Sequence, residues 1–500
     1  MNNGYFLSLA TALIIGATAV TAWAQDETDA LRYSQLAPSG TARSMGFGSA
    51  LGSVGGDFTS LSVNPAGIAV YRSSEMVFTP SIKIGSANGT YLGTSVSDDV
   101  SKFNINNFGM VFTNAKKGKR YEKSKWKSGS FALGFNKMAD FHRNYAYSGF
   151  NSGVSSSSGS EIFVVDANLG GDPEDAATLA GLGYQSYLLE YDTAMGGFYT
   201  VVPYQAGITQ RRTVSERGRQ NEFVISFGGN YMEKLLLGAT VGIPTIKYQR
   251  SSVYKESTNN TNPSDNPFGF NEYTYREDLL TKGTGINLKL GFIYKATDQF
   301  RFGASIHTPT VYSLTDNYEY TLNAQYNFDV PYEVLSGGTF SYVLTTPWRG
   351  VLSATGIIGK VGFITADYEY VGYNSARYNM DIDNGDYESY INTAIRSTYK
   401  GASNFRLGAE ARPMDILMVR LGFGYYGSPY KKSAGNGDRI DISAGLGFRF
   451  SDWFIDFALV NSSYKQAEQP YVLPYEGVIV PTANIKNSKN NAALTIGFKF

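Results

Sequence analysis

The feature that most constrains this chain is a strict alternation of apolar and polar residues, repeated in many segments of strand length. Residues 440–450 show it best, with Ile442 and Phe448 on the apolar face and Asp441 and Arg449 on the other. A soluble β-sandwich also alternates, but its charges face the solvent and its strands are shorter. Here the polar face combines glycine with charges of both signs, which suits a packed lumen. The pattern predicts an all-β fold, a closed antiparallel transmembrane β-barrel, because a bilayer tolerates no loose backbone groups.

The lengths of the turns predict the number of strands. Short polar breaks occur at residues 233–234, 296–298, 359–360, 412–414 and 451–452, and long breaks around residues 257–270, 324–332, 374–402, 428–437 and 466–490. Alternation of short and long breaks is typical of periplasmic turns and extracellular loops. From Leu235 to Phe500 it predicts five hairpins, hence ten strands.

Upstream, four further segments alternate, near residues 75–92, 103–113, 126–137 and 220–231, and they raise the count to fourteen. Residues 198–214 resemble a fifteenth strand. A closed single-chain barrel needs an even number, so we expect this piece to belong to a long loop. The predicted barrel spans residues 73–500, with large extracellular loops near residues 138–219 and 374–402.

Both large loops contain a stretch with helical spacing. In the first, residues 172–175 form a favourable helix start, and Leu179 and Leu182 follow at helical spacing. In the second, Asn384 precedes an amphipathic stripe that includes Ile391. These stripes either pack the loops onto the barrel rim or form an apolar surface that collects ligands.

Composition excludes several classes of function. The formal net charge is zero, so the chain lacks the basic surface that a nucleic-acid partner requires. There is no cysteine, and the two histidines, His142 and His307, are isolated, so we expect no metal site and no cofactor. Neither histidine lies in a recognisable catalytic motif, so we expect no enzyme activity.

Both ends of the chain carry export signals. An apolar stretch at residues 5–22 leads into an A-x-A cleavage pattern and predicts a signal peptide over residues 1–24. At the other end, Phe498 and Phe500 lie on the apolar face of the last strand. A terminal Phe resembles the signal by which barrel proteins are recognised for insertion. We therefore expect the barrel-assembly machinery to insert the chain into the outer membrane of a Gram-negative bacterium.

Residues 25–72 do not follow the strand pattern and are rich in glycine and alanine. A lumen of fourteen strands is too wide for wall side chains alone to fill, so we expect this segment to be an N-terminal hatch, or plug. Within it, Asn64, Pro65 and Ala66 predict a rigid turn, because Pro65 fixes its own φ and biases Asn64 away from helix. The turn either shifts when ligand binds or only seats the plug.

Several motifs resemble a known family. Residues 40–69 contain A-R-x-M-G-x-G-x-A followed by N-P-A-G, and further matches lie at residues 346–349, 366–370, 406–410 and 424–429. The chain resembles the FadL/TodX-type long-chain fatty-acid (hydrophobic compound) outer-membrane transporter family, in particular a Bacteroidetes-like branch. The resemblance implies a fourteen-stranded barrel with a hatch in the lumen and passive uptake of hydrophobic molecules. It also implies a lateral gap in the wall at an irregular third strand, although no proline marks one within residues 126–137.

Eight charged residues of the predicted strands are expected to face the lumen: Asp367, Glu369, Arg406, Glu410, Arg420, Asp441, Arg449 and Asp456. They form either a salt-bridge network that rigidifies the barrel or, in part, contacts to a ligand.

The leading functional hypothesis is passive outer-membrane transport of hydrophobic small molecules, either long-chain fatty acids or aromatic hydrocarbons, through a plugged barrel with a lateral exit. We expect a monomer that contacts its hydrophobic ligand, outer-membrane lipid and lipopolysaccharide. The alternative is a surface binding protein on the same barrel, for haem capture or adhesion. Scarce histidine weakens haem capture, although tyrosine also ligates haem iron.

Overall fold

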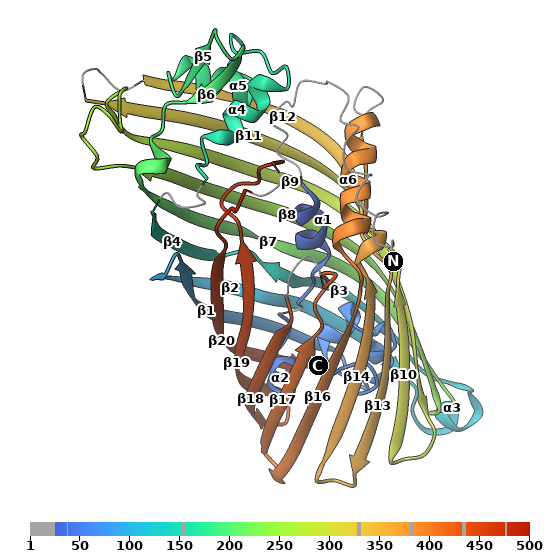
Figure 1. Cartoon of the computed structure of the whole chain (residues 1–500). Helices are drawn as coiled ribbons and strands as arrows, with labels where there is room; N and C mark the ends of the chain where they lie inside the picture. The colour runs from blue at the N-terminus through green and yellow to red at the C-terminus, as the bar shows by residue number, and fades with distance from the viewer. Residues whose placement is uncertain are drawn as a thin grey trace, which may run out of the picture.

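A computed structural model describes residues 26–37, 39–152, 157–327, 332–380, 385–432, 437–475 and 478–500. The predicted signal peptide lies outside these residues. Among them, no helix is long and apolar enough to cross a membrane. Most of the described chain forms one antiparallel sheet that closes on itself (Figure 1).

The wall of the barrel has fourteen strands, which confirms the predicted number. Ten are single elements and four are interrupted. In order around the wall they are β1 (Glu75–Tyr91), β2 (Thr94–Ala115), β3 (Trp126–Asp140) with β4 (Arg143–Asn151), β7 (Ile208–Tyr231), β8 (Leu235–Ser257), β9 (Phe270–Lys295), β10 (Phe300–His307) with β11 (Val311–Tyr326), β13 (Arg349–Ile358) with β12 (Tyr332–Thr345), β14 (Gly362–Gly372) with β15 (Arg377–Asn379), β16 (Gly401–Met414), β17 (Leu417–Tyr426), β18 (Arg439–Arg449), β19 (Trp453–Glu468) and β20 (Ala483–Lys499).

The last strand closes the barrel against the first. β20 pairs with β1 from Glu75↔Lys499 to Thr90↔Asn484. The terminal amide of Phe500 donates to the carbonyl oxygen of Ser74 at 3.1 Å. Closure leaves no free edge between the first and last strands, which is the condition for a sheet to cross a bilayer.

The short turns lie at one end of the barrel, here called the hatch end, and most of the long connections lie at the other, here called the loop end (Figure 1). The hatch end also holds α3 (Gly118–Lys123), in the connection between β2 and β3. The loop end holds α4 (Glu161–Asn168), α5 (Leu179–Gln185), the hairpin of β5 (Leu189–Asp192) with β6 (Gly197–Thr200), η3 (Tyr204–Ala206), η4 (Tyr373–Ser375) and α6 (Gly385–Thr398).

The strands run farther into the first large loop than the sequence predicts. β4 and the first half of β7 lie inside the range 138–219, so the connection between them covers residues 152–207. The segment 198–214, expected to be loop, contributes its last part to β7. Beyond a bilayer a strand no longer needs an apolar outer face, so the alternation fades while backbone pairing continues. In the second loop, residues 374–402, β15 and the first residues of β16 are likewise strand.

The predicted loop helices are present with different bounds. Residues 172–175 form turns, and α5 begins only after Thr178, whose side chain accepts from the amide of Gly181. The sequence analysis did not predict α4. Asn384, expected to precede the second helix, lies outside the described residues, and α6 begins directly after it.

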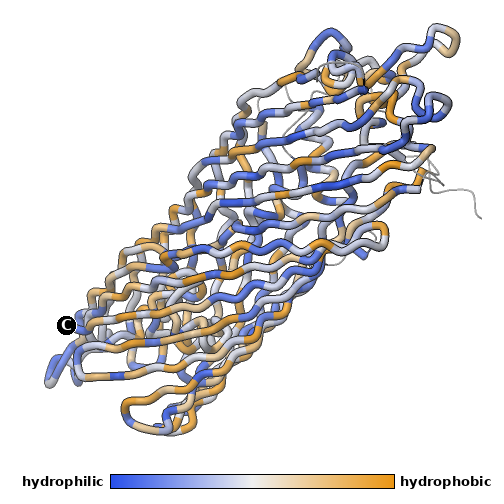
Figure 2. The backbone as a smooth tube through the Cα atoms, turned by 90° about the vertical axis from the view of Figure 1, so that its left-hand side faces the viewer, coloured by the Kyte–Doolittle hydropathy of each residue, from blue (hydrophilic) through white to orange (hydrophobic). Residues whose placement is uncertain are grey.

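Exposed apolar side chains surround the outer face of the barrel nearer the hatch end, here called the apolar belt. In Figure 2 the hydrophobic colour is densest in this half. Members include Phe78, Phe103, Phe227, Leu237, Phe292, Phe302, Leu352, Ile364, Leu407, Leu421, Leu446, Phe457 and Phe498. On β8 the exposed apolar residues stop at Ile243, and exposed Thr245 and Lys247 follow. A tilted strand crosses a bilayer in roughly 9–11 residues. β7, β8 and β9 have 24, 23 and 26, so their loop-end halves project beyond the belt.

Phe498 and Phe500 both lie on the outer face, 48% and 67% exposed, and the Phe500 ring lies 6.3 Å from that of Phe112. We predict that deleting Phe500 lowers the amount of heat-modifiable barrel in outer-membrane fractions severalfold, because an aromatic anchor and part of the insertion signal are lost. Lys499→Ser is the matched control and should leave that amount unchanged. Equal amounts of barrel in the deletion and the control would contradict the prediction.

Candidate functional site

The hatch segment lies inside the barrel as four short helical elements. They are α1 (Glu27–Ser34), α2 (Ala42–Gly46), η1 (Phe58–Ser62) and η2 (Pro65–Val70), and most of their residues are buried. Each follows a residue whose side-chain oxygen accepts a backbone N–H of the first turn: Asp26, Thr41, Asp57 and Asn64. Polar caps satisfy amides that no helix of this length can pair internally.

Asn64, Pro65 and Ala66 form the turn that opens η2. The side-chain oxygen of Asn64 accepts from the amide of Ala66 at 3.1 Å. Its side-chain nitrogen donates to the carbonyl oxygens of Gly52 at 2.6 Å and of Phe292, on β9, at 3.1 Å. Asn64 is fully buried, so this one side chain ties the turn to the hatch and to the wall.

The hatch rests on wall glycines. Gly228, Gly238 and Gly291 are cross-strand neighbours on β7, β8 and β9. A Cβ on Gly238 would lie 2.3 Å from the carbonyl of Pro65, and one on Gly291 would lie 2.0 Å from the side-chain oxygen of Asn64. Any larger residue here would displace the turn. Two further pairs lie against the hatch in the same way: Gly109 with Gly134 against the Phe58 ring, and Gly408 with Gly422 against Phe47.

Two groups of ion pairs hold the predicted lumenal charges. In the first, Arg420 contacts Glu410 at 2.6 Å and Asp456 at 2.7 Å, and Arg449 contacts Asp456 at 2.9 Å. Arg43 of the hatch lies 3.2 Å from Glu410. A charge taken out of water needs such partners, so this group joins the wall to α2.

The second group lies on β13, β14 and β16. Arg349 contacts Glu369 at 2.6 Å, and Arg406 lies 3.3 Å from Glu369 and 3.5 Å from Asp367. Asp367 also accepts the hatch amide of Gly52 at 3.1 Å. Asp441, the remaining predicted member, lies apart and pairs with Arg439 at 3.1 Å. These contacts favour a structural role for both groups, and a ligand contact stays a prediction.

The wall is interrupted between the second and third strands, a feature here called the wall break. The ladder of β2 with β3 ends at the pair Asn107 and Asn136. Beyond that pair, toward the loop end, the described residues of β2 pair only with β1, and those of β4 pair only with β7. β4 instead passes close to β1, because a Cβ on Gly89 would lie 2.4 Å from the carbonyl oxygen of Ala146.

Polar side chains gather at the wall break. The ammonium of Lys137 donates to Asn104 at 2.5 Å and lies 3.4 Å from Asp140. Lys83 lies 3.9 Å from the same carboxylate. The third strand bulges between Lys137 and Ala139. The irregularity therefore needs no proline, which is why the sequence analysis did not place it.

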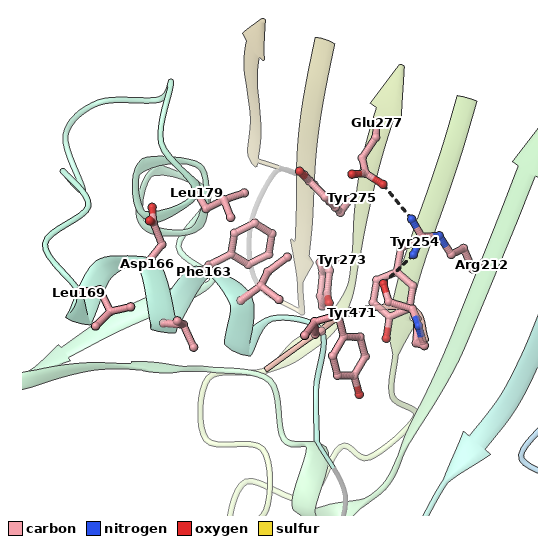
Figure 3. A pocket seen from close by; sticks show the side chains of 15 residues that line it. Phe163, Asp166, Leu169, Leu179, Arg212, Tyr254, Tyr273, Tyr275, Glu277 and Tyr471 are labelled. Atoms are coloured by element: carbon pink, nitrogen blue, oxygen red, sulfur yellow. Dashed lines mark hydrogen bonds and ion pairs between the residues drawn. The ribbon is translucent and has the colours of Figure 1, made fainter. Parts of the chain in front are cut away.

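A cavity of about 320 Å³, here called the cap cavity, lies at the loop end between α4 and the strands β7, β8 and β9 (Figure 3). Five aromatic rings line it: Phe163, Tyr254, Tyr273, Tyr275 and Tyr471. In Figure 3 Phe163 projects from α4 toward the tyrosines. These residues come from four distant segments, and sequence reasoning missed them. The spacing of Tyr273 and Tyr275 on one strand face was a usable signal.

α4 and α5 are joined by Asp166, which also lines the cavity. Its carboxylate accepts the amide of Ala180 at 2.8 Å. Burial raises the pKa of the Asp166 carboxyl above its ordinary value, and the Ala180 hydrogen bond opposes that shift. This hydrogen bond adds to the apolar packing between the two helices, in which Phe163 and Leu182 take part.

Neither histidine lines the cap cavity. His142 contacts Asp140 at 3.0 Å, and His307 contacts the hatch carbonyl of Val63 at 2.8 Å. Within the described part of the chain, no three His, Cys, Asp or Glu residues are grouped so that they could hold a metal ion.

Comparison with solved structures identifies the architecture. A *Pseudomonas aeruginosa* FadL homologue matches with a TM-score of 0.57 at 12% identity, over 93% of this chain and 100% of that one. The *Pseudomonas putida* toluene transporter TodX matches with a TM-score of 0.50 at 13% identity, over 92% and 98%. The chain has the FadL/TodX fold. No family model and no curated protein matches the sequence.

The FadL/TodX fold accounts for the barrel. The contact of the hatch with Gly228, Gly238 and Gly291, here called the glycine seat, is a property of this sequence that a mutation tests. We predict that Gly238→Ala lowers the free energy of unfolding by about 1–3 kcal/mol, because the added methyl overlaps the Pro65 carbonyl. Gly350→Ala is the matched control, since a Cβ there meets open space. Urea unfolding in lipid vesicles measures both, and equal stability of the two variants would mean that the hatch does not rest on this glycine.

Proposed function

We propose that this protein carries hydrophobic small molecules, long-chain fatty acids or aromatic hydrocarbons, passively across the outer membrane. The cap cavity is the observation that carries the proposal, because it places an aromatic-lined site at the loop end of a plugged barrel. The FadL/TodX fold supports it, since one of the matched structures is a toluene transporter. The loop end then faces the outside of the cell and the hatch end faces the periplasm.

The physical problem that such a protein solves is twofold. Lipopolysaccharide resists apolar solutes, and a water-filled pore favours polar ones. An apolar cavity outside the bilayer removes the solute from water, at roughly 25 cal/mol for each Å² of apolar surface buried. The hatch keeps the lumen closed to polar solutes.

The wall break supplies the proposed lateral exit. Beyond its last pair with β3, β2 carries exposed Phe103 and Ile105, which belong to the apolar belt. The break therefore begins at the depth of the bilayer. A hydrophobic solute that leaves there enters lipid directly, past the hatch residues Ala37 and Ser39, whose amides donate to the carbonyl oxygens of Met138 and Lys137 beside the break.

Binding to purified protein tests the ligand class. We predict binding of acyl chains with a large negative heat-capacity change, the marker of apolar burial. Affinity should rise with chain length, by up to about 0.8 kcal/mol for each buried methylene. Titration calorimetry in lipid nanodiscs measures both quantities. Affinity that does not depend on chain length, or a preference for sugars, would overturn the transport proposal.

Removal of the hatch tests the plug. We predict that deleting residues 26–70 raises single-channel conductance in planar bilayers and admits small polar solutes, because no other segment that the structure describes fills the lumen at that level. The deletion variant must first show the heat-modifiable migration of a folded barrel. A folded variant that stays as closed as the parent would mean that the hatch assignment is wrong.

The alternative of a surface binding protein has one observation in its favour. Exposed Tyr191, Met195 and Tyr199 lie on or beside the β5–β6 hairpin at the loop end. Haem binding that survived replacement of His142 and His307 would leave a tyrosine site open and would favour this alternative over transport.

A further inference from the structure

A row of basic side chains borders the apolar belt on three neighbouring strands. Arg219 on β7, Lys247 on β8 and Lys282 on β9 are direct cross-strand neighbours, in the pairs Arg219↔Lys247 and Lys247↔Lys282. All three are exposed on the outer face of the barrel. Arg217, also exposed, lies two residues farther toward the loop end of β7 and diagonal to Lys247. These four residues are here called the charge row.

The charge row lies just beyond the belt on its loop side. On each strand the exposed apolar side chains end, one short polar residue of the same face follows, and a cation comes next. These successive residues are Phe223, Asn221 and Arg219 on β7, Ile243, Thr245 and Lys247 on β8, and Ile286, Thr284 and Lys282 on β9. On β9 the belt runs from Tyr294 to Ile286, nine residues. A tilted strand needs about that length to cross the hydrocarbon core, so the charge row lies at the depth of the lipid head groups.

No described carboxylate neutralises the charge row. In the part of the chain that the structure describes, its four head groups take part in no ion pair or hydrogen bond. Farther along the same outer face, the acidic residues already have cations: Asp278 pairs with Arg276, and Glu272 pairs with Lys255. Like charges in directly opposed positions destabilise an antiparallel pair of strands. The row therefore destabilises the barrel unless an anion from outside the chain lies against it.

The position of the charge row determines which anion fits. Phosphate suits the head groups, because arginine binds it through a bidentate fork and lysine through a point charge. Neighbouring strands lie about 4.8 Å apart, so the three cross-strand cations are close enough to contact one phosphorylated sugar together. The belt residues beside them favour an occupant with apolar chains. A soluble anion would satisfy only the cations, whereas an anionic membrane lipid satisfies both surfaces.

We propose that the charge row binds the phosphate groups of lipid A, the membrane anchor of lipopolysaccharide, in the outer leaflet. The phosphates contact Arg219, Lys247 and Lys282, and the acyl chains lie along the adjacent apolar belt. This site goes beyond the proposed transport function and rests on it for one point, that the loop end faces the outside of the cell. Bound lipid A holds the barrel at a fixed depth, with the loop-end halves of the long strands outside the bilayer.

Lipid A and its dephosphorylated form test the proposal, because they share their acyl chains and differ in phosphate. The full mature chain is refolded in a neutral detergent, free of lipopolysaccharide, and heat-modifiable migration reports the closed barrel. Native mass spectrometry then measures binding of each lipid. We expect lipid A to bind about a hundredfold more tightly than the dephosphorylated form, and we expect added salt to reduce the difference.

A triple variant tests the residues. Arg219→Gln, Lys247→Gln and Lys282→Gln together should weaken lipid A binding about a hundredfold, to the level of the dephosphorylated form, at about fivefold for each cation removed. Because the three side chains are exposed and repel one another, the lipid-free variant should resist heat at least as well as the parent. Thermal unfolding in detergent thus separates lost binding from lost folding.

The matched control removes three cations from the outer face of the same strands, farther toward the loop end. It combines Arg211→Gln, Lys255→Gln and Arg276→Gln. Lys255 lies eight residues beyond Lys247 on β8, roughly 26 Å along the strand. The control carries the same change in net charge and should bind lipid A as the parent does.

The outcomes distinguish this inference from the proposed function. Equal binding of lipid A and its dephosphorylated form by the parent would overturn it, as would equal losses in the two triple variants. Tighter binding of polyglutamate than of lipid A would assign the row to an acidic protein and would also overturn it. Preference for phosphatidylglycerol over lipid A would place the row in the inner leaflet and refute the proposed orientation as well. The transport proposal fails separately, if neither acyl chains nor toluene bind the parent.

Discussion

The closing ladder between β1 and β20 is the interaction on which the rest of this structure depends. It pairs the backbone of the first and last strands, so that the sheet crosses the membrane without a free edge there. Closure of fourteen strands also creates a lumen that wall side chains cannot fill. The hatch fills that space, and the glycine seat and the two groups of ion pairs hold the hatch in place there.

In the lumen, the backbone of the hatch packs directly against the backbone of the wall strands. Wall glycines on β7, β8 and β9 let the Asn64–Pro65 turn approach the strands more closely than any side chain would allow. The ion pair of Arg43 with Glu410 and the hydrogen bond from the Gly52 amide to Asp367 then connect the hatch to the opposite wall. Hydrogen bonds from Gly52 and Ser353 to Asp367, and from Asn404 to Glu369, offset part of the cost of removing these charges from water. The barrel and its plug therefore form one packed unit.

The wall break and the cap cavity lack this close packing, and they are the two places for which we propose a function in transport. At the wall break, β2 leaves its partner β3 while still at the depth of the apolar belt, and Lys83 and Lys137 share the Asp140 carboxylate. At the cap cavity, five aromatic rings surround an unfilled space. Local departures of this kind persist only where the surrounding structure is well satisfied, and here the long paired strands provide that support.

The sequence by itself determined the barrel, its fourteen strands and the short turns of the hatch end, because inside a bilayer every strand must alternate apolar and polar residues. It also indicated the hatch, whose glycine-rich segment breaks that alternation, and the lumenal charges such as Arg406 and Arg420. Only the tertiary structure decided where strands end beyond the apolar belt, as in β4 and β7, because no apolar outer face is required there. Only it decided the glycine seat, the wall break and the cap cavity. Arg212, Tyr273 and Tyr471 are far apart in the chain, and they meet because closure and register bring their strands and loops together.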